Sequence, residues 1–220
     1  MELRKISVLL LAAATVLFCR AISAQPARFQ EPIPISPQMA TRNGAPTGWM
    51  LRGNAVKYYN TWTDIAQGLP MGSRCSVIAA NRREAVPDSR FATVMQAVSA
   101  EDYRGKRVRL SAQLSTFEVG GQAGLWMRID GLNGKVLSFD DMAGRVVRGT
   151  KPWSEYEVVL DVPRESVAIQ FGFLLAGDGE ARAAQFRFEV VDANTPLTAT
   201  DVPATNQALP KAPSNLELRL

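Results

Sequence analysis

The residues best suited to contact a ligand lie in one short stretch of the sequence, Trp126-Met127-Arg128-Ile129-Asp130. Successive side chains of a β-strand point to opposite faces, so Trp126, Arg128 and Asp130 are expected to share one face of such a strand. An indole ring stacks on the apolar CH face of a sugar, while flanking polar groups hydrogen-bond to its hydroxyls. The stretch therefore predicts a binding face for a carbohydrate or a similar polar ligand.

Other polar side chains interrupt apolar stretches elsewhere, and they join this face if their strands turn the same side outward. The predicted ligand-binding residues are then Trp126, Arg128, Gln96, Gln113, Asp140 and Gln170. A simpler interpretation stays open, in which Trp126 lies under a loop and the polar residues are only solvated, because an amphipathic strand needs no function. A further alternative is a partner-binding or structural domain of the cell envelope, in which the same face docks a protein.

The residue types that are absent exclude much of enzyme chemistry. The 220 residues contain no histidine and two cysteines. Ser-His-Asp and Cys-His catalysis are therefore excluded, as are His-ligated zinc, iron and copper sites and Cys-rich zinc sites. A glycoside hydrolase needs only two carboxyl groups, so Asp130 with Asp140 or Asp141 is kept as a minor alternative. We expect a binding protein with no catalytic residues, no metal and no cofactor.

The first 24 residues have the layout of a secretory signal peptide. Arg4 and Lys5 precede an apolar run from Ile6 to Phe18, and small residues follow at positions 21, 23 and 24. The run is short for a membrane span, so we expect its removal and a periplasmic or secreted protein without a membrane span. Two alternatives stay open: the segment is retained as an anchor, or Cys19 carries a lipid, although bulky residues before Cys19 disfavour lipid attachment.

Loss of a signal peptide changes the charge and the cysteine count. Residues 1–24 contain three basic residues and one acidic one, so the formal net charge falls from +4 to +2. That charge is too small for a nucleic-acid-binding surface. Only Cys75 then remains, which excludes an intramolecular disulfide. Its place at the head of an apolar run predicts a small buried residue rather than a reactive thiol.

The rest of the chain divides into a proline-bearing leader (25–46), one domain (47–192) and a proline-rich tail (193–220). Within the domain, alternating or apolar runs predict strands at 90–98, 108–115, 125–130, 136–139, 156–162, 167–175 and 186–191. Glycine-marked turns separate these runs and no convincing helical stretch occurs, which indicates an antiparallel sandwich or barrel. The tail has little to bury, although its last residues, 215–220, alternate and fit an edge strand.

Longer phrases of the domain carry a resemblance to a known family. They are Gly48-Trp49, Tyr103–Ser111, Gly124–Asp130, Phe139–Met142, Trp153–Pro163 and Phe186–Val191. Together they resemble a bacterial family of galactose-binding-like domains, related in plan to carbohydrate-binding modules, that occur as exported stand-alone proteins and attached to regulators. The resemblance covers residues 48–192 and implies an all-β, antiparallel jelly-roll β-sandwich. It does not imply one ligand, because the ligand of the family is poorly defined.

The resemblance also bears on single residues. Gln96, Trp126, Arg128 and Asp140 match recurrent positions on the presented sheet of the family. Carbohydrate-binding relatives often hold a structural calcium with an acidic residue just after the turn that corresponds to 177–179. Residues 180–185 offer few oxygen ligands here, so we expect no calcium at that place.

Two expectations follow from the sequence alone. Trp126→Ala is expected to abolish ligand binding with little loss of stability, because the ring is taken to point outward. Deletion of residues 193–220 is expected to leave the cooperative unfolding of the domain intact, because the tail is taken to bury little.

Overall fold

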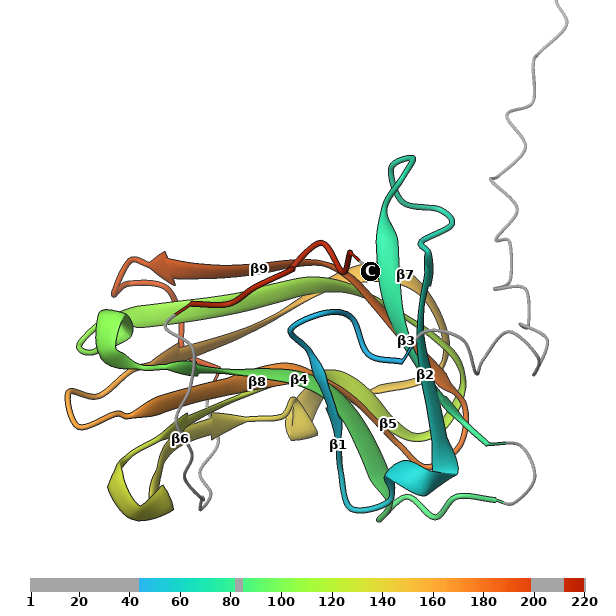
Figure 1. Ribbon diagram of the computed structural model, residues 1–220, viewed down its shortest axis with the longest axis horizontal. Coiled ribbons are helices and arrows are strands. Elements are labelled where there is room, and N and C mark those ends of the chain that lie inside the picture. Colours follow the sequence, from blue (N-terminus) through green and yellow to red (C-terminus); the bar gives the residue numbers. More distant parts are fainter. Residues whose placement is uncertain (1–43, 82–84, 199–211, 220) are drawn as a thin grey trace, which may run out of the picture. The chain divides into compact units, whose positions relative to one another are not determined.

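A computed structural model describes residues 44–81, 85–198 and 212–219 of the chain (Figure 1). These residues form antiparallel strands joined by turns, with 3-10 helices as their only helical elements. The strands are β1 (Met50–Arg52), β2 (Tyr59–Ile65), β3 (Arg74–Ala80), β4 (Phe91–Ser99), β5 (Arg107–Asp130), β6 (Val136–Asp140), β7 (Val147–Asp161), β8 (Ala168–Ala176) and β9 (Glu180–Val191). The 3-10 helices are η1 (Val56–Tyr58), η2 (Glu101–Tyr103), η3 (Leu132–Gly134) and η4 (Ala143–Arg145).

Two sheets share the long strand β5. The first sheet has the order β1-β4-β8-β5-β6 and uses residues 122–130 of β5. The second has the order β2-β3-β9-β5-β7 and uses chiefly residues 107–117 of β5. Figure 1 shows β9 in one layer and β4, β8 and β6 in the other. The chain is therefore an all-β, antiparallel jelly-roll sandwich, as predicted.

The alternating pattern of β5 explains which of its side chains enter the core between the two layers. Its inward residues in the first half, Val108, Leu110, Ala112 and Leu114, are at most 2% exposed. The strand then bends around Gly121, where a Cβ atom would collide with the carbonyl oxygen of Ala176. Glycine is required there because the backbones of β5 and β8 approach so closely. The bend carries β5 from one sheet into the other.

Aromatic side chains fill the core between the layers. The Trp49 ring packs on Phe171 and Phe186, with centroid distances of 6.0 and 4.7 Å. A second, smaller cluster on the other side of β3 contains Trp62 and Cys75. Cys75 is fully buried, and burial raises the pKa of its thiol to about 12. The prediction of a small buried cysteine is confirmed.

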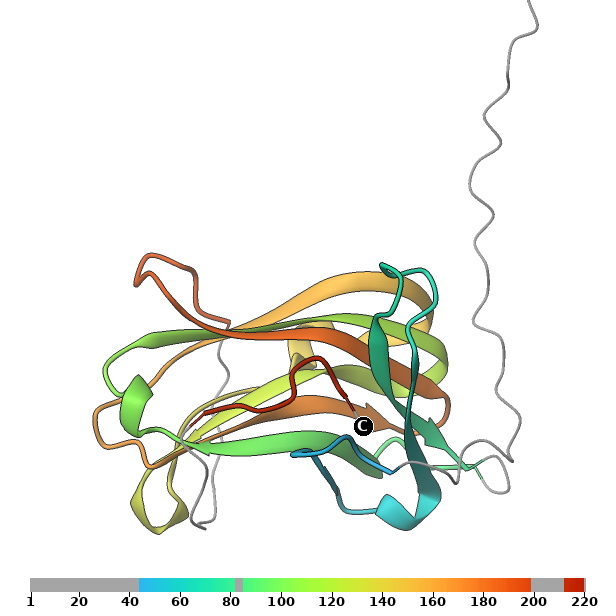
Figure 2. The same ribbon diagram turned by 45° about the horizontal axis from the view of Figure 1, so that its top comes forward.

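Residues 212–219, named the C-terminal strap below, pack against the sandwich between β9 and β4 (Figure 2). Leu218 is fully buried in the main core and Leu216 packs at its margin. The expectation that the tail has little to bury is wrong for these residues, because the alternating leucines supply apolar surface. The strap is also not an edge strand, since it ends in a turn with Asn215 and Leu218 in left-handed conformations.

The predicted signal peptide (1–24), most of the leader and residues 199–211 of the tail lie outside the described residues. Among the residues that are described, no helix has the length and apolar character needed to cross a membrane. The domain boundaries and the export of the protein stay predictions.

We expect Leu218→Ala to lower the free energy of unfolding by about 2–3 kcal/mol, because it leaves a cavity in the main core. Leu197→Ala is a matched control, since Leu197 is 45% exposed and its truncation is expected to cost less than about 0.5 kcal/mol. Urea unfolding of the full chain measures both. Equal stability of the two variants would show that the strap contributes nothing to the core.

Alkaline pH is expected to destabilise the fold. Burial raises the pKa of Cys75 from 9.0 to about 12 and that of Tyr59 from 10.0 to about 12. The unfolded chain ionises first, so the stability is complete below pH 9 and is lost as the pH rises towards 12. Between pH 8 and 10 the loss is about 1.5–2 kcal/mol, mostly from Cys75. Urea unfolding of Cys75→Ala should therefore show a much smaller loss over the same pH range than the unaltered chain.

Candidate functional site

The outward face of the first sheet is hollowed into a groove of about 1010 Å3, which β1, β4, β8, β5 and β6 line. Its floor is apolar and consists of Met95, Ala97, Trp126, Leu174 and Ala176, with Met50, Phe91 and Phe139 packed around them. Small-molecule sites are commonly concave, mostly apolar and of about this size. The groove is therefore the candidate ligand-binding site.

The Trp126 indole crosses the middle of this floor. Trp126 extends from β5, yet its Nε1 donates a 2.7 Å hydrogen bond to Oγ1 of Thr93 on β4. β8 runs between these two strands, and Gly172 is the β8 residue paired with Trp126. A Cβ atom at Gly172 would collide with the carbonyl oxygen of Val94, so glycine is required there by the close approach of β4 and β8. Thr93 in turn donates a 2.8 Å hydrogen bond to the carbonyl oxygen of Phe173, so the indole orientation is fixed on both strands.

Trp126 is more buried than the sequence led us to expect. The residue is only 8% exposed, because Met95 and Leu174 pack around its ring in the groove floor. Truncation to alanine would remove part of the floor and the hydrogen bond to Thr93. The burial of Trp126 instead predicts that Trp126→Ala costs about 3–5 kcal/mol, in place of the small loss expected from the sequence alone.

A polar cluster closes one end of the groove. Asp130 is fully buried, and its two carboxylate oxygens lie 3.0 and 3.1 Å from Nε and Nη2 of Arg128. Gln170, which is paired with Arg128 across β5 and β8, donates a 2.5 Å hydrogen bond to Oδ2 of Asp130. The Arg128 side chain remains 22% exposed, so it still presents donors to the groove. Its charge is balanced by Asp130, which suits a neutral polar ligand.

The opposite end of the groove is polar and open to solvent. Arg52, Asn54 and Asp88 are exposed there, and Gln122 is half-buried. Asn54 ties this end together, because its side chain donates to the carbonyl oxygen of Ser89 and accepts from the backbone N–H of Phe91, both at 2.9 Å. The groove therefore has an apolar middle and hydrogen-bonding groups at both ends.

Three of the six predicted residues lie together in this groove: Trp126, Arg128 and Gln170. Gln96 is paired with Phe171, so it faces the core, and it is 2% exposed. Gln113 lies in the first half of β5, within the second sheet, paired with Ala184 and Glu155. These two residues do not reach the groove.

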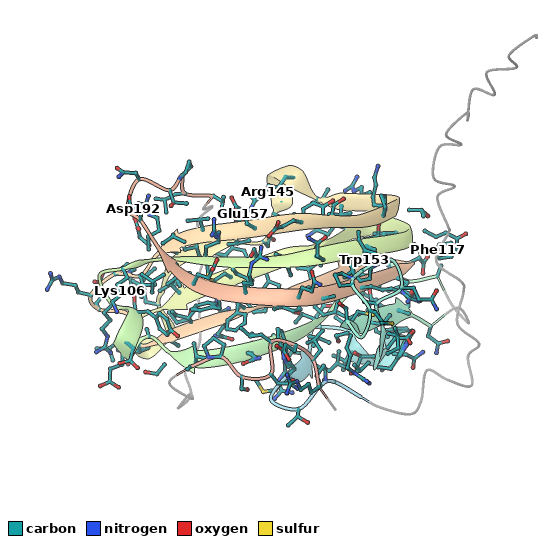
Figure 3. All side chains as sticks on the ribbon, turned by 90° about the horizontal axis from the view of Figure 1, so that it is seen from above. Lys106, Phe117, Arg145, Trp153, Glu157 and Asp192 are labelled. Carbon is teal, nitrogen blue, oxygen red and sulfur yellow. The ribbon has the colours of Figure 1, made fainter. Side chains whose placement is uncertain are left out.

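Asp140 is the third predicted residue outside the groove. It is paired with Met127, whose side chain is in the core, and it is 1% exposed. Its carboxylate accepts a 2.6 Å hydrogen bond from Nη2 of Arg145 and a 2.7 Å one from the N–H of Met142. The same Arg145 guanidinium donates to the carbonyl oxygen of Glu157 on β7, and the two residues are close in Figure 3. Asp140 therefore holds the loop at η4 to the second sheet.

The carboxylates do not form a glycosidase pair. Asp130 is fully buried and bound by two donors, while Asp140 lies on the other side of the first sheet and is bound by Arg145. Asp141 does line the groove, but its Oδ1 accepts a 3.0 Å hydrogen bond from the N–H of Ala143. No three His, Cys, Asp or Glu side chains gather into a metal site among the described residues.

Sequence reasoning missed most of the groove floor. The missed residues are Met50, Phe91, Thr93, Met95, Phe139 and Leu174. β4 and β8 are apolar on both sides, so their pattern did not show which residues face outward. A strand that is apolar on both faces in a two-layer sandwich is itself a signal, because its outer face must be covered or form a binding surface.

Trp153 lies elsewhere, on the second sheet (Figure 3). Its Nε1 donates a 2.8 Å hydrogen bond to the carbonyl oxygen of Gln67, and its ring packs against the smaller cluster that contains Trp62. It therefore anchors the loop between β2 and β3 and does not line the groove.

Comparison with known proteins gives one related sequence. No protein-family model matches the chain. A Bacillus subtilis protein named as an uncharacterized HTH-type transcriptional regulator, YbfP, is 38% identical over 159 residues, which cover 71% of this chain and 52% of that protein. The chain thus spans about half the length of this curated relative.

Solved structures show more distant similarity. A bacteriophage CBA120 tailspike protein 4 domain matches with a TM-score of 0.48 and 15% identity, over 66% of this chain and 20% of its own. A CBM22-1 xylan-binding domain from Paenibacillus barcinonensis matches with a TM-score of 0.44 and 14% identity, over 69% and 90%. TmCBM61, solved with β-1,4-galactotriose, matches with a TM-score of 0.43 and 12% identity, over 67% and 92%. All three scores are below 0.5, so the fold assignment rests on the strand pairing described above.

We expect Asp130→Asn to lower the free energy of unfolding by about 2–3 kcal/mol, because it leaves Arg128 without its buried counter-charge. Asp141→Asn is the matched control, since an asparagine can still accept the hydrogen bond from Ala143 and the change is expected to cost less than about 0.5 kcal/mol. Thermal or urea unfolding compares the two. A neutral Asp130→Asn would mean that the cluster does not stabilise this end of the sheet.

Proposed function

We propose that this protein is an exported, non-catalytic binding module whose ligand, a carbohydrate or a similar polar molecule, lies in the groove of the first sheet. The observation that carries the proposal is the fixed Trp126 indole in the middle of an apolar floor with polar groups at both ends. Sugars combine apolar CH faces with hydroxyl rims, so they need both kinds of surface at once.

The length of the groove favours an oligomeric ligand. Gln122 and Arg128 lie at opposite ends of the groove and six residues apart on β5. At about 3.3 Å per residue the two positions are ~20 Å apart, which is longer than a single sugar ring. The local neutrality of the Arg128–Asp130–Gln170 cluster supports an uncharged glycan over an anionic one.

The curated relative is named as a transcriptional regulator, and that name does not itself indicate carbohydrate binding. The alignment with this relative covers 159 of the 220 residues, so more than half of the aligned positions lie in the sandwich. The described residues contain no α-helix, so a helix-turn-helix is not part of the structure described. We propose that the sandwich of the present chain binds its ligand outside the cytoplasm, in line with its predicted signal peptide.

A second candidate is the docking of an envelope protein on the same groove. The observation that favours it is the apolar character of the floor, since eight apolar side chains line or surround it. A protein partner would bury this floor with its own apolar side chains. The two candidates differ in the ligand that the groove retains, and one experiment separates them.

The test is a glycan-array screen of the full chain, followed by titration of any glycan that binds. Phe139→Ala and Gln122→Ala change groove residues that no other described function requires, and each is expected to weaken binding about tenfold, equivalent to about 1.4 kcal/mol. Gln113→Ala is the matched control, because Gln113 lies on the second sheet.

Each outcome of this screen has a definite meaning. Glycan binding that survives Phe139→Ala and Gln122→Ala would place the site outside the groove. Absence of binding across the array would overturn the carbohydrate proposal and favour the protein partner.

A further inference from the structure

The C-terminal strap occupies a slot that is built as a binding site for a peptide. The slot is formed by residues 47–49, which precede β1, and by Gln96 in the middle of β4. The strap meets this slot through its backbone as well as through its leucines. It contributes no strand to either sheet, so its attachment depends on these contacts.

Gln96 recognises the strap backbone. Its Nε2 donates to the carbonyl oxygen of Ser214, and its Oε1 accepts a 2.9 Å hydrogen bond from the N–H of Ser214. These two hydrogen bonds, one donated and one accepted, resemble those that a residue of an adjacent β-strand makes with its partner. Gln96 is 2% exposed with the strap in place, so the Ser214 backbone satisfies both hydrogen-bonding groups of a buried amide.

Trp49 and Asn215 fix the strap at a second point. Trp49 Nε1 donates a 3.1 Å hydrogen bond to the carbonyl oxygen of Asn215, whose side chain donates a 3.0 Å hydrogen bond to the carbonyl oxygen of Thr47. Asn215 also accepts a 2.6 Å hydrogen bond from the N–H of Arg219, which closes the terminal turn. This turn directs Leu218 into the main core.

The slot and the groove share two strands. Trp49 is followed directly by Met50, and Met50 and Arg52 of β1 form one wall of the groove. Gln96 lies between Met95 and Ala97, whose side chains point to the opposite face and form part of the groove floor. β1 has only three residues and pairs with β4 alone among the described strands, so the slot holds this wall at one end of β1 while the hydrogen bonds of Asn54 to Ser89 and Phe91 hold it at the other.

We propose that the slot is a peptide-binding site whose ligand is the chain's own C-terminal strap, and that its occupancy braces β1 and so forms the adjacent wall of the groove. The chemistry of the site selects an extended peptide with a backbone contact at Gln96, an asparagine turn and a leucine three residues later. The effect on ligand binding rests on the proposed function, whereas the effect on β1 does not.

A cysteine crosslink tests the occupant. A Cβ atom at Gly48 would lie 3.6 Å from Cβ of Ser214, within the range that a disulfide requires. Gly48→Cys with Ser214→Cys in the full chain is therefore expected to form an intramolecular disulfide, seen as a faster monomer band on a non-reducing gel. Gly44→Cys with Ser214→Cys is the matched control, because Gly44 also has a positive φ but no atom within 4 Å of its Cβ position.

Two results of this experiment would overturn the proposal. No crosslink in the Gly48–Ser214 pair beyond that of the Gly44 pair would show that the strap is not in the slot. A crosslinked dimer would show that the occupant is the strap of a second copy.

Amide hydrogen exchange tests the coupling to β1 without any ligand. Asn215→Ala with Leu218→Ala is expected to release the strap and to raise the exchange rate of residues 50–52 at least tenfold. Residues 169–175 of β8, in the centre of the sheet, are the internal control and should keep their protection. If the strap loses protection while β1 keeps its own, the coupling is wrong.

The oxidised and reduced forms of the crosslinked chain provide a second comparison if the released variant fails to fold. Oxidation should lower the exchange of residues 50–52 relative to the reduced form, and equal exchange would contradict the coupling. A glycan found on the array is then titrated against both forms. Failure to find a glycan removes the proposed function but leaves the exchange result as a separate test of the strap.

Discussion

The structure depends on the passage of one strand, β5, from one sheet into the other. β5 pairs with β6, β7, β8 and β9, so every sheet contact between the two halves of the sandwich passes through it. Its first half supports a charged outer surface, on which Arg109 contacts Glu157 and Glu189. Its second half carries Trp126 and Arg128 into the groove. The close approach at Gly121 allows one amphipathic strand to serve both surfaces.

Sequence reasoning predicted the sandwich and the face of β5, because strict alternation assigns each of its side chains to the inside or the outside. The same reasoning placed Gln170 correctly, since it interrupts a face that is otherwise small and apolar. It failed for Gln96 and Asp140 because their strands have no clear alternation, and each residue faces the core. Pattern alone does not distinguish an outward polar side chain from a buried one whose hydrogen bonds are satisfied.

The strap was missed for a related physical reason. Its partners, Thr47, Trp49 and Gln96, are far away in the sequence, and no local pattern identifies a contact over such a separation. The two leucines of the strap gave only a weak signal, which fitted an edge strand equally well. Buried polar residues thus have separate roles in this domain: Asp130 orders the groove, Asp140 holds a loop, and Gln96 holds the strap.

The long separation of the strap from its slot also bears on how the domain reaches its native state. Trp49 and Asn215 are 166 residues apart, so their contact closes almost the largest loop that the described chain allows. Contacts of this range form slowly, because closing such a long loop costs conformational entropy before the contact contributes any favourable free energy. The hairpin of β2 and β3, by contrast, pairs residues that are close in sequence. We therefore expect the strap to dock at a late step of folding, after the two sheets have assembled.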